Sequence, residues 1–143
     1  MRLALESARR GLAAGEPPVG ACLVRDGQVV ARTHNAVIAE TDVTAHAEVR
    51  VIREACRSLR TLDLSGSRLF VTVEPCAMCV AACAYAGIEE VVFGAGIEVL
   101  ESHTGSEQTA PAGDGAVRLS GGLLSEACAS LIDQWAARAA RPA

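Results

Sequence analysis

Four side chains with the chemistry of a metal centre lie in two short motifs. His46 and Glu48 form a His-x-Glu motif, and Cys76 and Cys79 form a Cys-x-x-Cys motif directly after Pro75. One imidazole and two thiolates suit zinc, and three protein ligands leave the fourth position of a tetrahedral ion for water. A structural zinc site normally fills all four positions, and the chain has no second Cys-x-x-Cys pair. The pattern therefore indicates a catalytic zinc ion.

Glu48 is the candidate for proton transfer at that ion. It lies two residues from His46, close to the metal without having to bind it. An activated water needs a base, and a residue that acts as base and then as acid needs a pKa near the working pH. His46 taken alone would fit a hydrogen-bonded core histidine. Its register with Glu48 and the cysteine pair favours the metal site.

The elements around these motifs predict how the side chains meet. Apolar residues recur at helical spacing over residues 44–59, with Thr44 or Asp42 as the cap. Residues 68–73 form a strand pattern, Pro75 suits the first turn of the next helix, and residues 90–93 form another strand. Both ligand sets then come from helix N-termini at the ends of strands, where sites in α/β folds lie.

The remaining pattern completes one sheet. We predict a helix at residues 3–14 and a hairpin of two strands, 19–25 and 28–33, around an Asp-Gly turn. After the central elements we predict a long loop at 94–115, a short strand at 117–120 and a closing helix at 123–140. Strand, helix, strand in this order favours a right-handed crossover. The predicted fold class is α/β, a three-layer α/β/α sandwich with a mixed five-stranded sheet.

Composition limits the class of protein. The 143 residues are 50% apolar and 21% charged, which is typical of a globular protein, and we predict a single domain over residues 1–143. The longest apolar run, residues 77–86, is half of what a membrane helix needs. The N-terminus lacks a secretory apolar region, so the expected location is cytoplasmic. The six cysteines are then expected to be thiols or metal ligands rather than disulfides.

The same motifs occur together in a known group of proteins. The chain resembles the cytidine deaminase-like superfamily, in particular its tRNA adenosine deaminases, guanine deaminases and fungal-type cytosine deaminases. The resemblance is carried by Pro-Val-Gly-Ala at 18–21, Thr-Ala-His-Ala-Glu at 44–48, Val-Glu-Pro-Cys-Ala-Met-Cys at 73–79 and Val-Val-Phe-Gly-Ala at 91–95. His-x-Glu followed by Pro-Cys-x-x-Cys is the signature of zinc nucleobase deaminases.

The resemblance implies a function and roles for named residues. It implies hydrolytic removal of an amino group from a nucleobase or nucleoside, with zinc as the cofactor. Glu48 would be the catalytic proton shuttle, and Asn35 and the backbone amide of Ala47 would contact the substrate. The zinc ligands would be His46, Cys76 and Cys79. The resemblance further implies a homodimer.

The substrate is less constrained than the reaction. Residues 1–68 carry ten arginines and eight acids, whereas residues 69–117 carry seven acids and neither lysine nor arginine. Since RNA demands cations, this stretch favours a small base or nucleoside of guanine or cytosine type over tRNA. The alternative, a tRNA-specific adenosine deaminase, is supported by the first helix and by residues 121–128, which resemble that branch. An inactive zinc-stabilised binding module is a third hypothesis, which the intact Glu48 disfavours.

An aromatic side chain could stack on a base, and the sequence has four candidates. Phe70 and Phe93 lie in predicted strands and are expected in the core, which leaves Tyr85 and Trp135. Tyr85 is the preferred substrate contact, because the helix that carries Cys79 would bring it toward the pocket. For six further side chains we expect core or surface positions, with a role in the site as the alternative: His34, Cys83, Glu98, Glu101, His103 and Glu107.

Overall fold

A β-hairpin forms one side of the sheet. The computed structural model describes residues 1–105 and 115–139. Strands β1 (Gly20–Arg25) and β2 (Gln28–His34) pair antiparallel. Asp26 and Gly27 between them have φ angles of 51° and 73°, the positive values of a tight hairpin turn. The predicted hairpin is therefore confirmed.

Three parallel strands form the rest of the sheet. They are β3 (Ser67–Val73), β4 (Glu90–Ala95) and β5 (Arg118–Ser120), and β1 is antiparallel to β3. The strand order across the whole sheet is β2-β1-β3-β4-β5. Helix α3 (Ala77–Tyr85) connects β3 to β4. The register places the carboxyl ends of β2, β3 and β4 and the amino end of β1 along one edge of the sheet.

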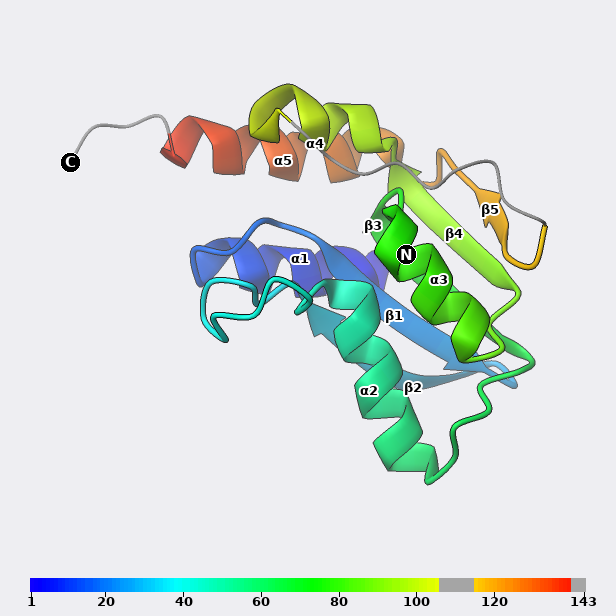
Figure 1. Ribbon diagram of the computed structural model, residues 1–143. Helices are drawn as coiled ribbons and strands as arrows, with labels where there is room; N and C mark the ends of the chain where they lie inside the picture. Colours follow the sequence, from blue (N-terminus) through cyan, green and yellow to red (C-terminus); the bar gives the residue numbers. More distant parts are fainter. Residues whose placement is uncertain (106–114, 140–143) are drawn as a thin grey trace.

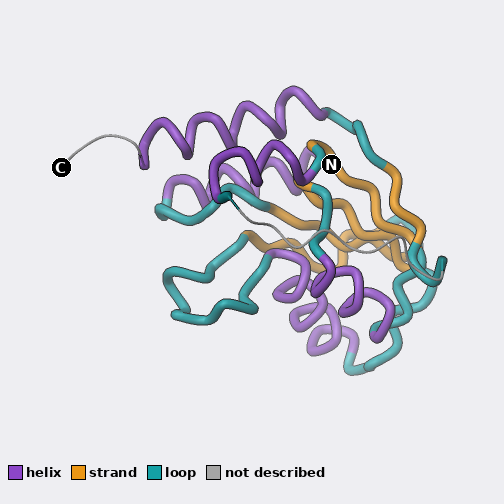
Figure 2. Tube along the Cα trace, turned by 45° about the horizontal axis from the view of Figure 1, so that its top comes forward, coloured by secondary structure: helices purple, strands orange, loops and turns teal. Residues whose placement is uncertain are grey.

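Helices cover both faces of this sheet (Figures 1 and 2). Helix α2 (Ala47–Leu59) lies beside α3 on one face. Helices α1 (Arg2–Ala13), α4 (Ile97–Thr104) and α5 (Ser125–Ala139) lie on the other. The predicted three-layer sandwich with a mixed five-stranded sheet is confirmed. The single domain over residues 1–143 stays a prediction, because residues 106–114 and 140–143 lie outside the described part.

Apolar stripes join the helices to the sheet in two clusters. On the α2 side, Ala47, Val51 and Ala55 recur every four residues and pack against Leu69 and Val71 of β3, all with no exposed surface. This spacing keeps them on one face of the helix. The opposite cluster joins α1, α4 and α5 through Leu5, Ala8, Leu12, Leu100, Cys128, Leu131 and Ile132. The two clusters hold the helices in fixed positions relative to the strand ends.

The approach of α1 to the sheet depends on a glycine. A methyl group on Gly20 would overlap the carbonyl oxygen of Ala4 and the amide nitrogen of Ala8. The amide of Gly20 donates to the hydroxyl of Thr72, with N and Oγ1 3.0 Å apart. The first residue of β1 is thereby fixed between α1 and β3, next to the sheet edge where the predicted site residues gather.

Two predicted boundaries are wrong. The first part of the loop predicted at 94–115 is the end of β4 followed by α4, in which Ile97 and Leu100 turn a buried face inward. This helix has only eight residues between two glycines, so its apolar spacing is too short to stand out from the surrounding Gly, Ser and acidic residues. Residues 106–114 of that predicted loop lie outside the described residues.

The second wrong boundary is the start of α2. The helix begins at Ala47, with His46 at the N-cap, rather than at Thr44. Asp42 does not cap it: its Oδ1 accepts hydrogen bonds from the amide and hydroxyl of Thr44, at 2.8 and 2.7 Å, and forms a turn before the helix. No helix in the described residues combines the length and apolar character that crossing a bilayer requires.

Candidate metal centre and active site

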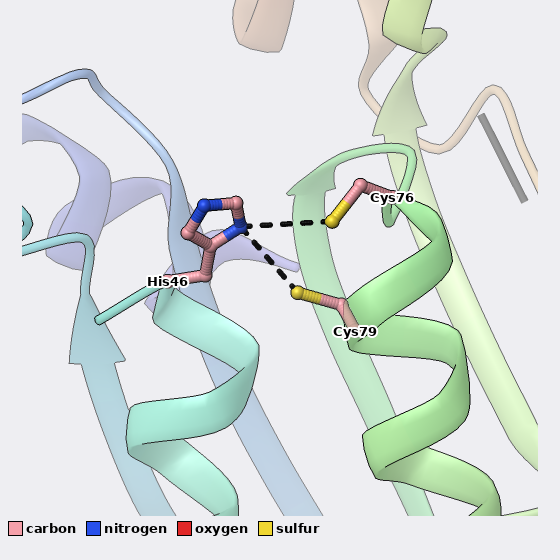
Figure 3. A group of neighbouring side chains, drawn as sticks. All are labelled: His46, Cys76 and Cys79. Atoms are coloured by element: carbon pink, nitrogen blue, oxygen red, sulfur yellow. Dashed lines mark hydrogen bonds between the residues drawn. The ribbon is translucent and has the colours of Figure 1, made fainter. Parts of the chain in front are cut away.

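The imidazole and the two thiols of the predicted metal site converge (Figure 3). Nδ1 of His46 lies 3.7 Å from Sγ of Cys76 and 3.5 Å from Sγ of Cys79. The three candidate ligand atoms all lie within 4.8 Å of one another. Side chains 30 and 33 residues apart in the chain therefore meet at one point.

Two helix starts produce this convergence. His46 and Cys76 are the N-cap residues of α2 and α3, each with extended backbone, and Cys79 lies in the first turn of α3. Because α2 and α3 lie on the same face of the sheet, their N-termini open side by side at the edge formed by the ends of β2 and β3. The positive ends of both helices then favour negatively charged ligand atoms at this point.

The donor set fits zinc. With typical bond lengths, a sulfur and a nitrogen bound to one tetrahedral zinc ion lie about 3.6 Å apart. The two N···S distances here, 3.7 and 3.5 Å, lie on either side of that value. One nitrogen and two sulfurs fill three tetrahedral positions, and the pocket beside them also contains Glu48. The arrangement thus has the ligands of a catalytic zinc site and an acid–base group next to it.

The cysteine pair is already polarised. The Cys79 thiol donates a hydrogen bond to Cys76, which lowers the pKa of Cys76 to about 4, with a further contribution from His46. The same hydrogen bond, together with burial, raises the pKa of Cys79, because that thiol keeps the shared proton. Metal ligands must be deprotonated, so the pair offers one thiolate in advance and releases a proton when the second thiol binds.

Glu48 is buried next to this group, in the first turn of α2. Its side chain is 3% exposed, and Oε2 has no hydrogen-bond partner among the described residues. Burial raises the pKa of Glu48 to about 7, against the opposing effects of its own backbone amide and of His46. A carboxyl group with a pKa near neutral can both accept and return a proton.

A cavity of about 210 Å³ opens above these groups. Two predicted substrate contacts border it together with Glu48: Asn35, 5% exposed just after β2, and Ala47 at the start of α2. The backbone N–H of Asn35 donates to the carbonyl of Val19, and the hydroxyl of Thr33 donates to the carbonyl of Ala47, with an O···O distance of 2.8 Å. The backbones of both residues are therefore held by hydrogen bonds. The first N–H groups of a helix such as α2 have no acceptor within the helix, so they can face the cavity.

The structure does not bring Tyr85 to the cavity of its own chain, and a substrate contact through it stays a prediction. Tyr85 is 94% exposed and does not border the cavity. Six residues separate it from Cys79, so along α3 it is rotated by about 240° and displaced by about 9 Å from the ligand. Trp135 packs against the cluster around α1 and α5 instead. Among the described residues, no aromatic side chain borders the cavity.

Two glutamates near the site were missed by the sequence analysis. Oε2 of Glu74 accepts from the amide of Ile97, which joins the metal-binding turn to the start of α4. Glu16, 1% exposed, accepts from the amides of Ile38 and Ala39. Each glutamate precedes a proline, and this repeated Glu-Pro pair is the one signal that could have drawn attention to them.

Helix α4 provides a cavity wall that the sequence analysis also missed. Ile97, Leu100 and Thr104 recur at intervals of three and four residues, which is one face of a helix, and all three border the cavity. The wall is mainly apolar, as is the opposite side formed by Val37 and Val43. The polar groups that border the cavity, among them Asn35, His46 and Glu48, are thus flanked by apolar side chains.

The remaining candidates lie outside the cavity lining. Nδ1 of His34 forms a hydrogen bond with the carbonyl of Asn35. Nε2 of His103 lies 3.4 Å from Oδ1 of Asp133. Cys83 belongs to the core cluster under α2, where burial raises its pKa to about 12. Glu98 is exposed on α4. All six cysteines are free thiols.

Comparison with known proteins identifies the family. Residues 1–95 match the cytidine and deoxycytidylate deaminase zinc-binding region. The tRNA-specific adenosine deaminases of Aquifex aeolicus and Agrobacterium fabrum are 46% and 50% identical over 95 residues. In each case this is 66% of the present chain, and it is 63% and 62% of the relatives. The matched segment is thus shorter than two thirds of either relative.

Solved structures support the same assignment. The guanine deaminase from Nitrosomonas europaea has a TM-score of 0.86 at 26% identity, covering 94% of this chain and 81% of its own. A structure from a study of tRNA:A34 deaminases has a TM-score of 0.75 at 37% identity, covering 92% and 96%. With the zinc-type ligand group and the matching sequence region, these similarities lead to one conclusion: the chain belongs to the zinc-binding cytidine and deoxycytidylate deaminase family.

Proposed function

We propose that this protein hydrolytically removes the amino group from a nucleobase, with adenosine in tRNA as its substrate. One observation carries the reaction: a buried carboxyl group, Glu48, with one unpaired oxygen and a pKa near neutral beside a zinc-type ligand set at a cavity. Leaving an oxygen of a buried carboxyl group unpaired is costly, so the arrangement favours a chemical role over a structural one.

The chain's own residues divide the work. His46, Cys76 and Cys79 would hold zinc, which acts as a Lewis acid that makes water more acidic. Glu48 would accept a proton from the attacking water and deliver it to a ring nitrogen. It would then take a second proton, from the hydroxyl group added to the ring carbon, and deliver it to the departing amino group, which leaves as ammonia.

Asn35 and Ala47 would orient the base. A carboxamide offers both a donor and an acceptor, so Asn35 can match one polar edge of a base or a ribose hydroxyl. The backbone amide of Ala47 offers a second donor from the start of α2. Between the apolar walls these two groups, with Glu48, would determine which ring atom faces the metal.

The comparisons favour tRNA over the small substrate expected from charge. The curated relatives at 46–50% identity are named tRNA-specific adenosine deaminases. The cation-free stretch, residues 69–117, supplies only part of the surface: it includes α3 on one face of the sheet and α4 on the other, whereas α1 and α2 carry arginines. On the α2 flank, Arg50, Arg53 and Arg57 line a surface hollow together with Glu40 and Glu54.

A free base of guanine type is the second candidate. Its support is the similarity in fold to guanine deaminase and the apolar lining of the cavity, in which Val43 is 83% exposed. None of the residues bordering the cavity is an arginine. Cytoplasmic location stays a prediction from the sequence.

A homodimer through α3 fits the exposed face of that helix. The segment 77–86 has no charged residue, and Ala81, Ala84 and Tyr85 are exposed on it. An aromatic side chain that is 94% exposed on an uncharged helix is the pattern of an interface rather than of a solvated surface.

Replacing Cys79 by alanine should remove the metal. We expect the wild-type protein to contain about one zinc ion per chain and the variant to contain almost none, because two ligands hold zinc poorly. Metal content after dialysis measures this. Cys83→Ala, one helical turn away in the core, is the matched control and should keep its zinc; equal loss in both variants would contradict the assignment.

Replacing Glu48 by glutamine should abolish turnover and leave zinc bound. The amide has nearly the same shape but cannot take up a proton, so we expect ammonia release to fall by roughly 100- to 10,000-fold. Steady-state assays with parallel zinc analysis test this. Unchanged turnover in the zinc-loaded variant would refute the proposed role of Glu48.

The substrate should be identified by a direct competition. We expect ammonia release, and inosine in the product, from anticodon-loop RNA containing a target adenosine, with a rate that falls as salt is raised because phosphate contacts are screened. Guanine, cytosine and their nucleosides are assayed alongside. Turnover of free bases alone would establish the second candidate instead.

Replacing Tyr85 by glutamate should weaken self-association. A buried unpaired charge at an interface is costly, so we expect a shift from dimer to monomer in light scattering. Val29→Glu introduces the same charge at an exposed apolar position on β2 and serves as the control. A wild-type protein that is monomeric at micromolar concentration would disprove the dimer.

A further inference from the structure

Glu16 is a buried carboxylate outside the metal centre. It lies between α1 and β1, is 1% exposed, and does not border the cavity. Its Oε1 accepts from the amide of Ala39 at 2.7 Å, and its Oε2 accepts from the amide of Ile38 at 3.1 Å. Both oxygens are thus used on two consecutive backbone amides more than twenty residues away.

Those amides belong to the segment that encloses one side of the pocket. Residues 36–45 connect Asn35 to His46, and Val37 and Val43 within them border the cavity. The segment has little regular structure of its own and turns back on itself through Ala36 N to Ala45 O at 3.0 Å. Ile38 and Ala39 are exposed at their side chains, so side-chain burial does not hold this part in place.

A second anchor holds the residue that follows Ala39 in the same segment. Arg50 of α2 donates to the carbonyl of His34 and pairs with Glu40, with Nε and Oε1 3.0 Å apart. This pair is partly exposed, so solvent weakens it. The Glu16 carboxylate is itself buried and its hydrogen bonds are charge-assisted, which are the stronger kind. Glu16 is therefore the stronger of these two anchors.

We propose that Glu16 is a positioning residue for the substrate: it holds residues 36–45 so that Val37, Val43 and Asn35 keep the shape of the pocket. The inference rests on the proposed function for its kinetic consequence only. Pro17 after it borders the cavity, and the ring of Pro17 disfavours a helical backbone at Glu16.

The test is the variant Glu16→Gln. Its amide group can still accept from one backbone N–H but places a donor against the other. We expect amide hydrogen exchange at Ile38 and Ala39 to become at least about tenfold faster, with zinc content unchanged. We expect KM to rise by roughly tenfold and kcat to change less, because the segment shapes the binding wall and does not touch the reacting atoms.

Glu54→Gln, an exposed glutamate on α2, is the matched control and should alter neither exchange nor KM. Glu16→Asp keeps the charge but shortens the reach, so it should behave like Glu16→Gln. If these Glu16 variants do not fold, exchange in the wild-type protein decides: protected amides at Ile38 and Ala39 support the anchor, and rapid exchange there overturns it.

The two proposals can fail separately. A wild-type protein that deaminates no base or RNA would refute the proposed function, while the exchange measurement would still report on the anchor. An active protein in which Glu16→Gln leaves KM and exchange at the level of the Glu54→Gln control would refute the anchor and leave the proposed function intact.

Discussion

The side-by-side packing of α2 and α3 on one face of the sheet is the constraint on which the site depends. Their N-caps, His46 and Cys76, contribute ligand atoms only because both helices begin at the same edge. Parallel pairing of β3 and β4 fixes the start of α3, and the hairpin places the end of β2 beside it. The positive ends of both helix dipoles also lie at this edge, next to the thiolates.

Burial gives the same small region its acid–base character. Glu48 would be an ordinary surface carboxylate if α2 were isolated, but within the sandwich it is 3% exposed and its pKa rises to about 7. Desolvation destabilises the charged form of any carboxyl group, so packing of the helix, rather than a special neighbour, tunes this one. The scaffold that positions the candidate metal ligands therefore also gives Glu48 a pKa near neutral.

Two glutamates extend this dependence from the metal centre to the walls of the pocket. Glu74 joins the metal-binding turn to α4, and Glu16 joins the α1–β1 connection to residues 36–45. Glu74 binds a backbone amide at the start of a helix, and Glu16 binds two amides of a segment with little regular structure of its own. Substrate discrimination would then depend on how these walls are held, as well as on the groups that touch the base.

The sequence by itself determined the reaction centre and the fold class, because these depend on spacing along one element or on strong local periodicity. His-x-Glu and Cys-x-x-Cys each place groups within one helical turn, and the Asp-Gly turn requires no distant contact. Only the tertiary structure showed α4 as a wall, Tyr85 at the surface, and Glu16 and Glu74 as anchors. A short helix and a buried carboxylate have no local signature, since their roles come from partners brought close when the sheet forms.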